Sequence, residues 1–140
     1  MHVKPVVGSV VGPTSVTHWA QILQLPTAYG VVEVAYPDGA ARAAGIHLLS
    51  TLSQRLTDGP VSLKALSRIV SDVVKDGIRT VLVVVPVGNI FYIVLRGNGD
   101  VYLKRNHEFA QLLHGQGEIS GEVKIGDTVL LTSAEFSKAI

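Results

Sequence analysis

Residues 63–95, LKALSRIVSDVVKDGIRTVLVVVPVGNIFYIVL, change their hydrophobic period from that of a helix to that of a sheet near Gly77. After Gly77, residues 80–87 and 90–95 are rich in β-branched side chains, and Gly88-Asn89 between them suits a tight hairpin. Before Gly77, apolar residues recur every three or four positions, which is the spacing of one buried helical face. These residues are Leu63, Leu66, Ile69, Val70, Val73 and Val74. The stretch predicts a helix followed by antiparallel strands.

Upstream of this stretch, the sequence predicts two strands and a further helix. Residues 17–25 and 29–35 have the composition of strands, and Pro26-Thr27 lies in the turn between them. Residues 40–56 repeat the helical period, and Ser62 is a good N-cap for the next helix. The apolar face of the first helix consists of Ala41, Ala44, Leu48, Leu52 and Leu56.

Downstream, short strands are expected at residues 100–104, 109–113 and 128–131, followed by a helical tail over residues 134–140. No repeat or linker interrupts the chain, so we expect one domain over residues 1–140. The expected fold class is α/β in the broad sense (α+β). Mainly antiparallel meander strands would form it together with a two-helix layer.

Charge and composition narrow the possible partners. The chain has 12 Lys and Arg against 11 Asp and Glu, scattered singly, and no cysteine. Nucleic acid is therefore not an expected partner, and disulfides are excluded. The longest apolar stretch, residues 80–87, is far shorter than the about 20 residues of a membrane helix, so no membrane span is expected and a cytoplasmic location is the default. With 47% hydrophobic and 16% charged residues, the chain is apolar enough to predict a protein partner or a homodimer.

Three segments, in this order, carry a resemblance to a known family. Residues 34–40 read VAYPDGA before an alanine-rich helix, residues 94–103 read VLRGNGDVYL, and residues 126–136 read GDTVLLTSAEF. Together they resemble motifs of the metal-dependent protein phosphatase (PPM) family. The resemblance implies a helix–sheet–sheet–helix sandwich, and an activity in which two divalent cations activate a water to hydrolyse phosphoesters.

The chain departs from the family at the positions that would hold metal. Tyr36 stands where the first metal-binding aspartate is expected, and Ala134 and Glu135 replace the Asp-Gly after the last strand. The expected phosphate-binding arginine has no counterpart in residues 8–16, GSVVGPTSV, and the final Asp-Asn of the family would fall beyond residue 140. We therefore expect a degenerate, truncated relative with no catalytic residues, no metal ligands and no cofactor.

A second register keeps catalysis open as an alternative. If Asp38-Gly39 is itself the Asp-Gly of the family, the chain would be a metal-dependent serine/threonine phosphatase with an atypical site and Mg²⁺ or Mn²⁺ as cofactor. The candidate residues for that site are Asp38, Gly39, Asp100, Asp127 and Glu135.

The histidines show neither i,i+4 pairing nor an HExxH pattern, so we interpret them as structural or surface residues. They are His2, His18, His47, His107 and His114. The favoured hypothesis is a non-catalytic, phosphatase-like binding or regulatory module of a larger protein or complex. The alternatives are the active hydrolase and a structural homo-oligomeric subunit, and a sheet face that the predicted helices leave uncovered would serve binding in either non-catalytic case.

Overall fold

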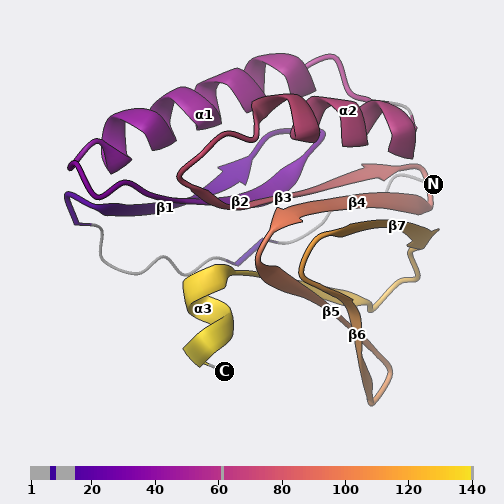
Figure 1. Ribbon diagram of the computed structural model, residues 1–140. Helices are drawn as coiled ribbons and strands as arrows, with labels where there is room; N and C mark the ends of the chain where they lie inside the picture. Colours follow the sequence, from indigo (N-terminus) through magenta and orange to yellow (C-terminus); the bar gives the residue numbers. More distant parts are fainter. Residues whose placement is uncertain (1–6, 9–14, 61, 140) are drawn as a thin grey trace.

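The computed structural model describes residues 7–8, 15–60 and 62–139, with side chains as far as residue 136. Two helices, two antiparallel sheets and a short C-terminal helix make up this part of the chain (Figure 1). The elements, in chain order, are β1 (His18–Gln24), β2 (Tyr29–Ala35), α1 (Ala41–Leu56), α2 (Leu63–Val73), β3 (Ile78–Val87), β4 (Ile90–Gly97), β5 (Gly99–Arg105), β6 (Glu108–His114), β7 (Gly117–Glu122), β8 (Thr128–Ser133) and α3 (Ala134–Ala139).

The strands form a large sheet in the order β1-β2-β3-β4-β7 and a small sheet in the order β6-β5-β8. Helices α1 and α2 cover one face of the large sheet, and the small sheet lies on the side away from them (Figure 1). The chain passes from one sheet to the other at Gly97, whose φ of 86° favours glycine. A Cβ at Gly97 would lie 2.1 Å from the carbonyl oxygen of Arg79, so no larger residue fits this crossing.

Two apolar clusters follow from the alternation of side chains along the strands. Between the helices and the large sheet, Leu52, Leu66 and Val81 are fully buried. Between the two sheets, Leu82, Ile93 and Val101 are fully buried. At about 25 cal/mol per Å² of apolar area, this double burial is the main stabilising contribution to the fold.

The structure confirms the predicted fold class and most of the predicted elements. The helix predicted from Leu63 begins where expected, because the Ser62 side chain accepts a hydrogen bond from the amide of Ala65 at 3.1 Å. It ends at Val73 and not at Gly77, since Val74 already has extended backbone angles. Strand β7 was not predicted, because its sequence, GEISGE, lacks a β-branched run. It becomes a strand by pairing with β4 in the large sheet. The strands of the predicted meander are thus divided between two sheets.

The outer face of the small sheet has little helical cover among the described residues. The six-residue α3 packs against β5 and β8, whereas α1 and α2 lie over the large sheet (Figure 1). None of the helices in the described part of the chain is both long and apolar enough to span a membrane.

Candidate functional site

Strand alternation places His18 and Glu33 on the same face of the large sheet. His18 pairs with Ala35 and Ala20 pairs with Glu33 between β1 and β2, and residues two apart along a strand share a face. Trp19, with the opposite orientation, packs on Gly45 of α1. Glu33 therefore points away from the helices, toward the small sheet.

The start of α3 brings Glu135 to this face. The amide of Ala134 donates a hydrogen bond to the Thr80 hydroxyl at 3.0 Å, and the amide of Glu135 donates one to Oε1 of Glu33 at 3.1 Å. Thr80 in turn donates to the carbonyl oxygen of Asn98 at 2.6 Å. These bonds satisfy amides that a helix leaves open in its first turn, and they fix the Glu135 backbone above β2.

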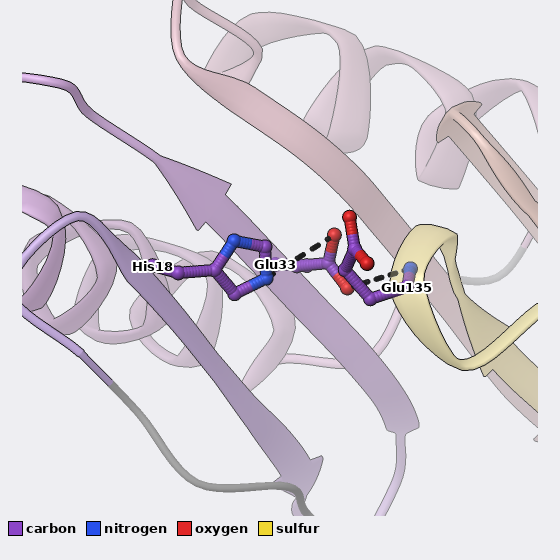
Figure 2. A group of neighbouring side chains, drawn as sticks. All are labelled: His18, Glu33 and Glu135. Atoms are coloured by element: carbon purple, nitrogen blue, oxygen red, sulfur yellow. Dashed lines mark hydrogen bonds and ion pairs between the residues drawn. The ribbon is translucent and has the colours of Figure 1, made fainter. Parts of the chain in front are cut away.

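His18, Glu33 and Glu135 form a three-residue group that we call the ligand cluster. One ligand atom from each lies within 4.8 Å of the other two. Figure 2 shows the three side chains converging from β1, β2 and α3. Within the described residues, this is the one group of three or more histidine or acidic side chains with that spacing. The spacing suits donors that share one bound cation.

Glu33 has an unusual environment within the cluster. The residue is 0% exposed, and its Oε2 atom has no hydrogen-bond partner. His18 Nε2 lies 3.7 Å from this oxygen, which suits an ion pair but is too long for a hydrogen bond. A buried carboxylate oxygen without a hydrogen bond carries a substantial desolvation cost, and a bound cation would offset it.

Arg79 is the positive charge beside the cluster. Its Nη2 atom lies 3.5 Å from Oε1 of Glu135, and both side chains are partly exposed. The guanidinium therefore pairs with the exposed carboxylate of the cluster, whereas the carboxylate of Glu33 is buried. The cluster thus combines two acidic side chains and one imidazole with a neighbouring arginine.

Of the metal-ligand candidates predicted from the sequence, the structure brings one into the ligand cluster and leaves the others outside it. Glu135 belongs to the ligand cluster, whereas Asp38 accepts a hydrogen bond from the amide of Ala40 at 3.1 Å, at the start of α1. Gly39 adopts a φ of 88° beside it, as a turn glycine does. Asp100 accepts hydrogen bonding from Gln111 and contacts His114 Nδ1 at 2.5 Å, on the small sheet. These aspartates do not join the cluster.

Asp127 is held by an arginine. Nε and Nη2 of Arg105 donate to its two carboxylate oxygens at 2.8 and 2.7 Å. These hydrogen bonds are the main reason that the pKa of Asp127 lies below its ordinary value, and the same pairing raises the pKa of Arg105. The amide of Lys124 also donates to Asp127, closing the turn before β8. Asp127 thus fastens a turn.

Sequence reasoning missed His18 and Glu33. The motif register assigned the ligand position to Tyr36, but its hydroxyl donates to the carbonyl oxygen of Asp76 at 2.8 Å, near the end of α2. The available signal was Glu33 itself, a charged residue inside the valine-rich strand YGVVEVA. A buried strand carries such a residue when its charge has a partner. His2, another of the histidines, lies outside the described residues.

The architecture is that of metal-dependent serine/threonine protein phosphatase domains. The catalytic domain of the phosphatase PstP in complex with two manganese ions matches with a TM-score of 0.70 and 15% identity, over 94% of this chain and 76% of that one. The Mycobacterium tuberculosis phosphatase PstP/Ppp matches with a TM-score of 0.69 and 14% identity, over 87% and 73% of the two chains. Because the sequence identities are this low, these matches show a shared fold and nothing more.

A third similar structure is the phosphatase domain of the Bacillus subtilis cell fate determinant SpoIIE. It matches with a TM-score of 0.51 and 15% identity, over 84% of this chain and 59% of that domain. No family model matches the chain. No curated protein sequence gives a significant match either.

The expectation of a chain without a cofactor is wrong. A phosphatase with this fold contains two manganese ions, and His18, Glu33 and Glu135 converge here as potential ligands. Two hard cations, however, need several converging carboxylates. The cluster supplies two carboxylates and one imidazole, so its donors fit one ion better than two.

Proposed function

We propose that the chain is a phosphatase-fold binding module that holds a divalent cation in the ligand cluster without hydrolysing phosphoesters. One observation carries the proposal: the other candidate carboxylates are engaged elsewhere. Asp127 binds Arg105, Asp38 holds the start of α1, and Asp100 contacts Gln111 and His114. Two-metal hydrolysis needs such groups around the ions, where they bind the attacking and leaving oxygens.

The surface that would bind a protein partner is the outer face of the small sheet. Tyr102 pairs with Leu130 and Lys104 pairs with Phe109, which places all four side chains on one face. Tyr102 stacks on Phe109 with ring centroids 5.1 Å apart, and Phe109 is 62% exposed. Exposed aromatic and aliphatic side chains that adjoin one another support a role in protein binding, as a regulatory part of a larger assembly.

Hydrolysis of p-nitrophenyl phosphate and of a phosphoserine peptide tests the proposal. The chain would be assayed with Mn²⁺, Mg²⁺ and Zn²⁺ in turn, beside its Glu33→Gln variant, which keeps the oxygen that accepts from Glu135 and loses the charge. We expect both proteins to release phosphate at the background rate. Turnover that requires a metal and disappears in Glu33→Gln would instead establish the alternative, an active hydrolase.

A further inference from the structure

We propose that the ligand cluster is a one-ion site for a borderline cation of the Zn²⁺ class, and that Arg79 takes the place of a second metal ion. This inference builds on the proposed function, since it specifies which ion the module binds. The proposed site holds one ion, whereas a phosphatase structure with the same fold contains two manganese ions. Three features of the cluster support it: the donor atoms, their spacing and the position of Arg79.

The donor atoms favour a borderline cation. Hard ions such as Mg²⁺ and Mn²⁺ prefer sites made of oxygen, whereas imidazole nitrogen suits Zn²⁺ and its neighbours. The cluster offers Nε2 of His18 with one carboxylate each from Glu33 and Glu135. Three protein ligands of this kind leave a fourth position of a tetrahedral Zn²⁺ open.

The spacing fits one small ion. Bonds of about 2.1 Å in a tetrahedron place the donors about 3.4 Å apart. His18 Nε2 and Glu33 Oε2 lie 3.7 Å apart, and all three ligand atoms are within 4.8 Å of one another. Small rotations of the partly exposed His18 and the exposed Glu135 would close the set around the fixed, buried Glu33. An ion there would also coordinate Oε2 of Glu33, which has no hydrogen bond.

Arg79 supplies the second positive charge. Its guanidinium lies 3.5 Å from Oε1 of Glu135, which belongs to the same carboxylate that the first ion would use. A second ion near this oxygen would meet the positive charge of Arg79 at close range and would be repelled. With one divalent ion, Arg79 and the carboxylates of Glu33 and Glu135, the charges sum to about +1, so no second ion is needed for neutrality.

Calorimetric titration of the 140-residue chain with Zn²⁺ and with Mn²⁺ tests the inference, with the visible spectrum of bound Co²⁺ as a second readout. We expect one Zn²⁺ per chain, weaker Mn²⁺ binding and a four-coordinate Co²⁺ spectrum. Glu33→Gln should lower Zn²⁺ affinity at least tenfold, roughly the smallest loss that outer-shell changes produce. His18→Asp, which makes the donors all oxygen, should narrow the preference for Zn²⁺ over Mn²⁺ by a similar factor.

Arg79→Gln tests the charge beside the cluster. At a separation of about 7 Å in a water-like dielectric, removing this unit charge should raise the affinity for the doubly charged Zn²⁺ about sevenfold. Arg42→Gln, an exposed change on α1 across the large sheet, is the matched control and should leave affinity unaltered. Circular dichroism of each variant would check that it folds. If Glu33→Gln unfolds, His18→Ala removes a ligand at a partly exposed position and serves in its place.

Three results would overturn the inference. These are two Mn²⁺ ions per chain with affinity equal to that for Zn²⁺, Zn²⁺ binding that persists in both ligand variants, and no binding of Zn²⁺ at millimolar concentration. Failure of the proposed lack of catalysis is a separate result, because it would show as metal-dependent phosphate release. An unchanged Zn²⁺ affinity in Arg79→Gln would remove the role assigned to Arg79.

Discussion

The amide of Glu135 donates a hydrogen bond to Oε1 of Glu33 across 102 residues of sequence, at a distance of 3.1 Å. This bond joins the start of α3 to a fully buried side chain in the middle of β2. It leaves Oε2 of Glu33 directed at the His18 side of the cluster. The position of the C-terminal helix therefore determines whether the three ligands meet.

Thr80→Val should loosen this arrangement. The hydroxyl of Thr80 links the carbonyl oxygen of Asn98 to the amide of Ala134, and valine removes both bonds while keeping the shape. We expect a loss of about 1–3 kcal/mol in the free energy of unfolding, the range for buried groups left unsatisfied. Metal affinity should fall about 10–100-fold, as for other changes that misplace a ligand.

Urea unfolding and calorimetric titration measure the two effects of Thr80→Val. Thr80→Ser keeps the hydroxyl and loses only the methyl group, so it should keep most of the stability and most of the metal affinity. Thr51→Val on the exposed side of α1 removes a local bond to the carbonyl oxygen of His47 and is the matched control. Full metal affinity in Thr80→Val would contradict a positioning role for Thr80.

Gly45→Ala should destabilise the contact between α1 and β1. A Cβ at Gly45 would lie 2.1 Å from Cε3 of Trp19, although alanine is the better helix former by about 1 kcal/mol. Because Trp19 is buried and cannot move freely, overpacking should outweigh propensity and destabilise by about 1–3 kcal/mol. Thermal or urea unfolding measures this, with the exposed Ser50→Ala as control. A stabilised Gly45→Ala protein would show that the helix shifts easily on the sheet.

Local patterns were enough to predict α1, α2 and the hairpin of β3 and β4, because the helices repeat the helical period over 16 and 11 residues and the two strands are rich in β-branched side chains around a Gly-Asn turn. Strand β7 was missed because its six residues become a strand by pairing with β4. The allocation of strands to two sheets is likewise a tertiary property. Sequence periodicity alone does not specify it.

The candidate site was predicted less completely than the fold. Glu135 was named from its motif, and the structure places it in the cluster. Glu33 and His18 were missed because their meeting depends on the pairing of β1 with β2 and on the approach of α3, which no local pattern encodes. The motif register pointed to Tyr36, which lies three residues after Glu33 and just beyond the end of β2.

Acid should weaken the fold through Asp127. Its folded-state pKa lies below the ordinary value of 3.8, chiefly because of the hydrogen bonds from Arg105. The pairing therefore stabilises the fold fully above that ordinary value, and its contribution is lost as the pH falls through the lower folded-state pKa. The pKa of Glu118 is lowered in the same sense, first by Ser67 and then by Arg96.

Asp127→Asn isolates the first of these contributions. We expect a lower free energy of unfolding at neutral pH. Below pH 3.8 this free energy should fall less steeply with pH than in the unchanged protein, while the pH dependence that comes from Glu118 remains. Urea unfolding from pH 2 to pH 7 measures the profile, and Asp58→Asn on the exposed turn after α1 is the control. An unchanged slope in acid would show that the ion pair with Arg105 does not contribute to the pH dependence.

The outer face of the small sheet should make the isolated chain associate. Phe109 and Leu130 are 62% and 40% exposed on this face, and soluble monomers rarely expose apolar patches beyond about a few hundred Å². We expect sedimentation velocity to show concentration-dependent association, and an apolar dye to bind. Phe109→Ser should reduce both, because it removes the aromatic ring that stacks on Tyr102. Ile46→Ser, which changes a 48% exposed residue on α1, should leave association unaltered. A chain that stays monomeric at high concentration without binding dye would show that this face needs no partner.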